Sequence, residues 1–254
     1  MYNNSANTQF TGKSILFLPS CHSTNTLAIE KVKSGDAANG LIIITHEQTS
    51  GRGQRGNTWL SEAGANLTLS VIYLPDTLKV RDAFYLNIIA SLAIADTLQH
   101  FLPGKDIRVK WPNDVYCGEK KLCGILIENS IRQQFISSVV IGIGLNVNQH
   151  ISGLPNAGSM IQECGEAFDL EQVFYFLVEN IERYYLLFQG DSKDILFRLY
   201  VEKLYWLGQT RTFKDSEGVF TGIIQGITES GRLIVDKENH TKFQYAFKEI
   251  EYLH

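Results

Sequence analysis

The sequence predicts an α+β protein, with a large unit of mixed strands and helices over residues 1–206 and a small all-β unit over residues 207–254. Two observations predict this division. As far as about residue 206, β-branched runs alternate with apolar positions at helical spacing. Beyond it, only short β-prone runs remain, split by turn-forming residues as in a small barrel: 210–213, 219–227, 233–235 and 243–247.

The first elements are justified by their local patterns. Residues 14–18 form a short apolar run that predicts a strand. Residues 23–25 (Ser-Thr-Asn) are good N-cap residues for a helix that Gly35 ends. Whether these three side chains only cap the helix or also face a ligand is left open by the sequence. Residues 40–46 form a continuous β-branched run, which is typical of a strand buried on both faces.

The middle of the large unit continues with strands around one long helix. Residues 66–74 alternate apolar and polar side chains, so we expect a half-buried strand. Apolar positions at helical spacing predict a helix over 79–101, which Pro103 and Gly104 terminate. Four further strands are predicted, the second and third as a hairpin around Gly118: 106–111, 115–117, 122–128 and 136–148.

The remaining segments are a leader, a loop and two helices. Residues 1–12 are polar and predict a loose leader, and residues 150–166 predict a mobile loop. Asp169 is an N-cap residue for a helix to Phe188, and a last helix is predicted over 193–206.

Composition excludes several classes of protein. A hydrophobic content of 44% and a charged content of 20% are those of a soluble globular chain. No secretory signal is visible, and no run approaches the roughly 20 apolar residues that span a bilayer. The four cysteines lack metal-ligand spacing and predict reduced thiols in the cytoplasm. The net charge of −4 disfavours a surface that coats nucleic acid.

The segment 48–59 (Gln-Thr-Ser-Gly-Arg-Gly-Gln-Arg-Gly-Asn-Thr-Trp) places three glycines and two arginines in six residues. Gly51, Gly53 and Gly56 allow tight folding, because glycine reaches backbone conformations that other residues avoid. Arg52 and Arg55 add planar, permanently charged donors that suit an anion. A solvated surface turn is the alternative interpretation of this segment.

Four further polar or glycine-bearing clusters lie at strand ends or within strands: 23–25, 110–114, 121–128 and 142–148. With the glycine–arginine segment they supply cations, the carboxylate of Asp114 and a glycine-lined backbone. This set suits a nucleotide phosphate with Mg²⁺, which binds through one or two carboxylates plus phosphates. The chain has no Walker loop, no Rossmann fingerprint and no G-x-S-x-G elbow.

The segment 51–56 (Gly-Arg-Gly-Gln-Arg-Gly) resembles the glycine–arginine signature of biotin protein ligases. The blocks 110–114, 121–128 and 142–148 resemble that family's other blocks, in the same order. The resemblance implies a mixed, largely antiparallel sheet with flanking helices, as in class II aminoacyl-tRNA synthetases and biotin–lipoate ligases, followed by an SH3-like β-barrel.

The resemblance also implies an enzyme, a biotin–[biotin carboxyl carrier protein] ligase. Biotin and MgATP would give biotinyl-5′-AMP, and the biotinyl group would pass to a lysine of a carrier domain. Partners would be that carrier alone, without nucleic acid or membrane, and the protein would be a monomer or homodimer.

The resemblance also implies a role for individual residues of this chain. Lys121, Arg52 and Asp114 are the expected catalytic residues, with Asp114 also the expected Mg²⁺ ligand. The expected biotin-binding residues are Ser23, Thr24, Asn25, Gln48, Gly51, Arg52, Gly53, Gln54, Lys121 and Gly124. The expected ATP- and adenylate-binding residues are Arg52, Arg55, Trp59, Lys110, Asn113, Gly142, Gly144 and Asn146.

The chain departs from the resemblance in two places. Gln54 stands where many relatives carry another arginine, so retention of the adenylate is expected to differ. The chain also begins almost directly at the catalytic unit, without room for a winged-helix module, which disfavours DNA binding. The alternatives are a lipoate or octanoate ligase, a non-catalytic biotin-binding regulator and a nucleic-acid-binding module.

Overall fold

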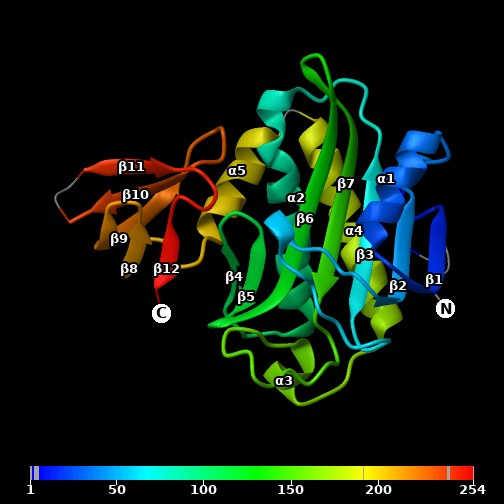
Figure 1. Ribbon diagram of the computed structural model, residues 1–254, viewed down its shortest axis with the longest axis horizontal. Helices are drawn as coiled ribbons and strands as arrows, with labels where there is room; N and C mark the ends of the chain where they lie inside the picture. The colour runs from blue at the N-terminus through cyan, green and yellow to red at the C-terminus, as the bar shows by residue number, and fades with distance from the viewer. Residues whose placement is uncertain (1, 3–5, 191, 239–240, 254) are drawn as a thin grey trace.

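The computed structural model describes residues 2, 6–190, 192–238 and 241–253. Its larger part is a seven-stranded sheet in the order β1-β2-β3-β7-β6-β5-β4 (Figure 1). Only β1 and β2 are parallel, so the predicted mixed, largely antiparallel sheet is confirmed. The strands are β1 (Ile15–Cys21), β2 (Ile42–Gln48), β3 (Leu67–Tyr73), β4 (Ile107–Lys110), β5 (Asp114–Cys117), β6 (Lys120–Arg132) and β7 (Phe135–Leu145).

Helices cover both faces of this sheet. One face packs against the helices α2 (Phe84–Phe101), α4 (Leu170–Gln189) and α5 (Lys193–Glu202). The other face packs against α1 (Thr24–Ser34), which ends at Gly35 in the left-handed conformation (φ 79°). The short helix α3 (Met160–Cys164) lies within the predicted loop 150–166. Two 3₁₀ turns complete the set, at Gln54–Gly56 and Val80–Asp82.

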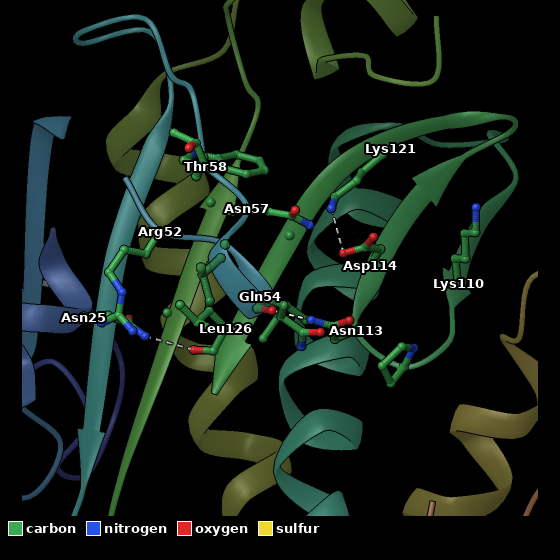
Figure 2. Close-up of a pocket in the computed structure, with 18 of the residues that line it drawn as sticks. Asn25, Arg52, Gln54, Asn57, Thr58, Lys110, Asn113, Asp114, Lys121 and Leu126 are labelled. Atoms are coloured by element: carbon green, nitrogen blue, oxygen red, sulfur yellow. Dashed lines mark hydrogen bonds and ion pairs between the residues drawn. The ribbon is translucent and has the colours of Figure 1, made fainter. Parts of the chain in front are cut away.

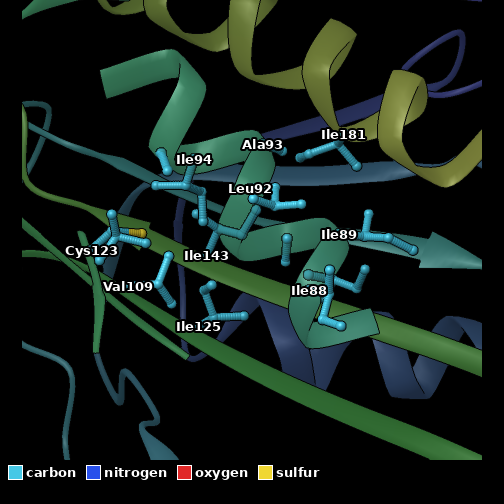
Figure 3. Packing of buried hydrophobic residues seen from close by; sticks show 14 of the residues in the cluster. Ile88, Ile89, Leu92, Ala93, Ile94, Val109, Cys123, Ile125, Ile143 and Ile181 are labelled. Atoms are coloured by element: carbon cyan, nitrogen blue, oxygen red, sulfur yellow. The ribbon is translucent and has the colours of Figure 1, made fainter. Parts of the chain in front are cut away.

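The core lies between the sheet and the helices, with α2 in the middle (Figure 3). Ile88 and Leu92 of α2 lie among the sheet residues Ile125 and Ile143, while Ile181 of α4 lies on the far side. Twelve of the eighteen α2 residues are buried, because the helix is covered by the sheet and by a second layer. Each buried isoleucine or leucine stabilises the fold by about 1.5–3 kcal/mol.

The second sheet follows residue 206 and is antiparallel, in the order β11-β10-β9-β8-β12. Its strands are β8 (Thr210–Asp215), β9 (Gly218–Ile227), β10 (Leu233–Lys237), β11 (Lys242–Tyr245) and β12 (Glu251–Leu253). In the part of the chain that is described, β11 and β12 remain at the two edges. The antiparallel sheet is therefore confirmed, whereas its closure into an SH3-like barrel stays a prediction.

Several predictions about single elements are wrong. The strand β3 is buried on both faces rather than on one, because Thr68 faces a polar cavity and Ser70 hydrogen-bonds Thr24 and Asn25 at the start of α1. Residues 6–12 of the predicted loose leader are attached to α4: the Glu182 carboxylate accepts hydrogen bonds from the backbone N–H of Gln9, Phe10 and Thr11. Residues 1 and 3–5 of that leader lie outside the described residues.

The structure also gives the bounds of two predicted helices and the state of the cysteines. The helix expected over 193–206 ends at Glu202, and that expected over 79–101 begins at Phe84. All four cysteines are free thiols, two of them buried. Among the described residues, no helix has both the length and the apolarity that a bilayer crossing requires.

Candidate active site

A cavity of about 890 Å³ opens on the α1 side of the large sheet (Figure 2). It is lined by the start of α1, the loop 52–59, the middle of β6 and β7, the loop 110–114 and a segment of the second sheet, 247–252. The volume is that of a site for a small molecule or cofactor. The cavity thus joins parts of the chain that are 200 residues apart.

At one end of the cavity, Thr24 fixes the side-chain amide of Gln48. The Gln48 Oε1 accepts hydrogen bonds from the Thr24 backbone N–H at 2.8 Å and from the Thr24 hydroxyl at 3.2 Å. With its oxygen occupied, Gln48 presents its Nε2 as a donor. Ser23 is the N-cap residue of α1, but its side chain makes no capping hydrogen bond and lines the cavity. The residues 23–25 therefore do more than cap the helix.

A buried hydrogen-bond network continues from Thr24 into the sheet. The Ser70 hydroxyl lies 2.8 Å from the Thr24 hydroxyl and 2.6 Å from Asn25 Oδ1. The Asn25 Nδ2 donates to Glu128 at 2.9 Å and to the Leu126 carbonyl at 3.2 Å. These bonds lock the polar wall of the cavity, because every member has at least one partner.

Arg52 reaches the same network through Glu128. Its two terminal nitrogens lie 2.8 and 3.3 Å from the two Glu128 oxygens, in the fork geometry that arginine forms with a carboxylate. The Arg52 side chain remains 44% exposed and lines the cavity, so part of the guanidinium is accessible to a ligand. In this conformation Glu128 neutralises the charge that an anionic substrate would otherwise meet.

Three glycines make room for the side chains that line the cavity. A Cβ built on Gly142 would overlap the Asn25 amide, and one built on Gly144 would overlap the Trp59 indole. Gly124 lies under the same ring, with its built Cβ 3.1 Å from the indole edge. Glycines within strands were expected to mark such close approach, and at Gly142 and Gly144 they do. The indole N–H of Trp59 is buried and has no hydrogen-bond acceptor among the described residues.

Two lysines lie toward the other end of the cavity. Lys121 Nζ is 2.8 Å from Asp114 Oδ1, and both side chains are about 30% exposed (Figure 2). The Lys110 ammonium lies 5.1 Å from the centre of the Tyr116 ring and 4.8 Å from that of Tyr252. Burial lowers the pKa of the Lys110 amine, while the negative charge of Asp114 opposes this shift. Asn113 donates its side-chain N–H to the Ile125 carbonyl.

Most of the predicted site residues line this one cavity, including Gly53 and Gln54. Three do not. Gly51 stabilises the loop through its carbonyl, which accepts a hydrogen bond from the backbone N–H of Trp59 at 3.0 Å. Asn146 is buried in the wall and donates to the Gly158 carbonyl at 3.0 Å. The Arg55 side chain lies outside the described part of the structure.

Sequence reasoning missed several residues that line the cavity and two residues of the hydrogen-bond network beside it, Ser70 and Glu128. Thr68 and Ser70 were assigned to a solvent face, although polar side chains on a strand between buried strands were a signal. Glu128 lies in a predicted block but received no role. The segment 247–252 had no local signal, because its position depends on how the second sheet packs against the first.

The carboxylates that line the cavity show what kind of Mg²⁺ site the residues could form. Asp114 and Glu251 are the carboxylates among the described lining residues, and no cluster of three metal-binding side chains is found in the described chain. One or two carboxylates suffice for Mg²⁺ that arrives with phosphates, so the residues fit an ion carried by the nucleotide. They do not form a site for a metal bound by protein alone.

Comparison with known proteins agrees with this geometry. Residues 17–146, just over half of the chain, match the model of the biotin/lipoate A/B protein ligase family. The chain belongs to that family. Residues 207–247, which contain β8 to β11 of the second sheet, match the model of the biotin protein ligase C-terminal domain.

Named relatives of this ligase family cover almost the whole chain. The bifunctional ligase/repressor BirA of Bacillus subtilis is 27% identical over 94% of this chain and 74% of the relative. The biotin–[acetyl-CoA-carboxylase] ligase of Mycobacterium tuberculosis is 29% identical over 86% of this chain and 82% of the relative. The biotin protein ligase of Aquifex aeolicus, solved with biotin and ATP, superimposes with a TM-score of 0.79 at 25% identity, covering 95% and 99% of the chains.

Proposed function

We propose that this protein is an ATP-dependent biotin protein ligase. It forms biotinyl-5′-AMP and pyrophosphate from biotin and MgATP, and then transfers biotin to a lysine of a biotin carboxyl carrier domain. The single observation that supports this best is the shared cavity. Arg52, Lys110 and Lys121 come from separate segments and line one cavity beside the polar Gln48–Thr24 wall.

The wall at Gln48 suits the ureido ring of biotin. The fixed Gln48 Nε2 donates, and the Ser23 and Thr24 hydroxyls can donate or accept, as a cyclic urea with one carbonyl and two N–H groups requires. The valeryl chain then runs past Gly124 of β6 toward the cations. Trp59 covers this path, with Gly142, Gly144 and Asn113 on the adenylate side.

The cations serve the first reaction. A biotin carboxylate oxygen attacks the α-phosphorus of ATP, the bond from that phosphorus to the bridging oxygen breaks, and pyrophosphate leaves with the electron pair. Both reactants are anionic, so Arg52 and Lys121 must neutralise them before they approach. When the substrates bind, Arg52 leaves its ion pair with Glu128 and binds a substrate oxygen instead. Lys121 likewise leaves Asp114 for a substrate oxygen.

Asp114 serves both reactions. Mg²⁺, when bound with the nucleotide, neutralises charge on the phosphates, and Asp114 would hold it. Once Lys121 has turned to the phosphate, the Asp114 carboxylate is released to orient the amine of the incoming carrier lysine. That amine attacks the acyl carbon, the bond from this carbon to the phosphate oxygen breaks, AMP leaves with the electron pair, and the amine gives a proton to water. We further propose that residues 1–206 and 207–254 form the two domains and that the enzyme acts in the cytoplasm, without a nucleic-acid partner.

The test is intact-mass analysis of a carrier domain incubated with this protein, biotin and MgATP. We expect one biotinyl group per carrier, on a single lysine, and no addition when ATP is omitted. Parallel incubations with lipoate and octanoate separate the two ligase classes. Modification by lipoate but not biotin would assign the acyl pocket to the rival class. Biotin binding without modification or pyrophosphate release would indicate a regulator instead.

A further inference from the structure

The second sheet contributes a turn to the catalytic cavity. Residues 246–250 connect β11 to β12, and Phe247, Lys248 and Ile250 of this connection line the cavity, together with Glu251 and Tyr252 of β12. The Tyr252 ring lies under the Lys110 ammonium, so this segment borders the lysine-rich end of the cavity. The cavity is therefore incomplete without the second sheet.

Lys248 has an unusual backbone within this turn. Its φ of 70° lies in the left-handed region, which costs a residue other than glycine roughly 1–2 kcal/mol. Such a conformation persists only where the surroundings hold it, and it is concentrated at functional sites. Here the Glu249 carboxylate holds the turn, accepting from the Ala246 backbone N–H at 2.6 Å and from Arg232 at 3.2 Å. The Glu249 N–H also donates to the Ala246 carbonyl at 3.0 Å.

Trp111 fixes this turn against the catalytic loop 110–114. The Trp111 indole N–H donates to the Gly231 carbonyl of the second sheet at 2.9 Å. Its ring meets that of Phe247 edge-on, with centroids 6.3 Å apart. Trp111 is buried and directly follows Lys110, so the position of Lys248 is tied to the residues that hold the substrates.

Charge indicates what the turn faces. The cations Arg52, Lys110, Lys121 and Lys248 line the cavity against two lining carboxylates, Asp114 and Glu251. Lys121 pairs with Asp114, whereas Lys248 has no carboxylate at ion-pair distance within the described residues. An exposed ammonium held by a strained turn at a cationic cavity favours a polyanion, for which lysine acts as a point charge.

We propose that Lys248 binds the β- and γ-phosphates of the nucleotide and the pyrophosphate that leaves. This inference rests on the proposed ligase function. It assigns the second sheet to the nucleotide: the strained turn adds one cation to the cavity that Arg52, Lys110 and Lys121 also line. Biotin, at the Gln48 end, does not contact Lys248.

The test is calorimetric binding of inorganic pyrophosphate, of ATP with Mg²⁺ and of biotin to the full chain. Lys248→Gly removes the ammonium and relieves the backbone strain, so it keeps the turn. We expect about tenfold weaker pyrophosphate and ATP binding, because one charge-assisted contact is lost, and unchanged biotin binding. Lys248→Arg should restore most of the affinity. The control is Lys242→Ala, which removes an exposed lysine of β11, and it should bind like wild type.

Wild-type affinity for pyrophosphate in both Lys248→Gly and Lys248→Asn, which also tolerates the left-handed backbone, would overturn the assignment and leave the ligase function standing. A wild-type protein that binds biotin but neither pyrophosphate nor ATP would overturn both. A circular-dichroism melt of each variant checks the fold, and Lys248→Gly should melt no lower than wild type.

Discussion

Two lysine–aspartate pairs of equal length have different surroundings in this protein. Lys121 Nζ and Asp114 Oδ1 are 2.8 Å apart in the cavity, and Lys237 Nζ and Asp215 Oδ2 are 2.8 Å apart in the second sheet. The cavity pair is about 30% exposed on each side. The pair in the sheet is only 12% and 6% exposed.

The Lys237–Asp215 pair is held in place by contacts with three aromatic side chains. Lys237 lies over the rings of Phe220 and Phe243, at 4.4 and 4.2 Å from their centroids. The Tyr245 hydroxyl donates to Asp215 at 2.8 Å. The cavity pair has water and substrate space beside it, so each partner can exchange the other for a ligand. The contact distance alone therefore does not separate a structural pair from a functional one, whereas the environment does.

The variant Lys121→Ala is expected to have the largest effect, and it tests whether the pair in the cavity is functional. We expect adenylate formation to fall about 10²–10³-fold, because a donor to the reacting phosphate is lost, while biotin still binds. Stability should change little, since the Asp114 left behind is in contact with water. Pyrophosphate release and biotin calorimetry measure the two effects. The matched control is Lys120→Ala, because the neighbouring amine bonds the Pro155 carbonyl outside the cavity. Unchanged turnover in Lys121→Ala would remove Lys121 from the mechanism.

The reverse result is expected for Lys237→Met. Removing one partner leaves the Asp215 charge buried, which typically lowers the unfolding free energy by about 3–5 kcal/mol. Turnover per folded molecule should change little. Urea denaturation followed by circular dichroism measures the loss. Glu217 also reaches Lys237, at 3.1 Å, but is 73% exposed, so Glu217→Ala should cost less than about 1 kcal/mol. Equal stability of Lys237→Met and wild type would contradict a structural role for the pair.

The smallest expected effect is a pH dependence of the buried pair. Burial raises the pKa of Asp215, but hydrogen bonds from Lys237 and Tyr245 outweigh this and hold it at about 2. The unfolded chain titrates near 4, so the stabilisation is complete above about pH 4 and is lost as the pH falls toward 2. We expect wild type to melt above Asp215→Asn at pH 6, with the difference narrowing between about pH 4 and pH 2. A difference that is constant with pH would exclude Asp215 as its source.

The sequence by itself determined the features that depend on residues close to one another along the chain. The apolar spacing from Phe174 to Phe188 gave the helix α4, because those positions repeat on one side of a helix. Gly142 and Gly144 within a strand indicated close approach, since a glycine there has no packing role of its own. The segment 51–56 and the three later blocks were enough to indicate the family, and they contain half of the residues that line the cavity.

The tertiary structure alone decided which distant groups meet. The pairing of Arg52 with Glu128 depends on β6 lying two strands from β3, which no local pattern encodes. The burial of Thr68 depends on the cavity that it lines, and that of Ser70 depends on the start of α1, where Thr24 and Asn25 are its hydrogen-bond partners. The placement of Lys248 in the lining of the cavity required a second sheet, docked through Trp111 and Gly231. Propensity and periodicity act over a few residues, whereas these contacts are set by how whole sheets pack.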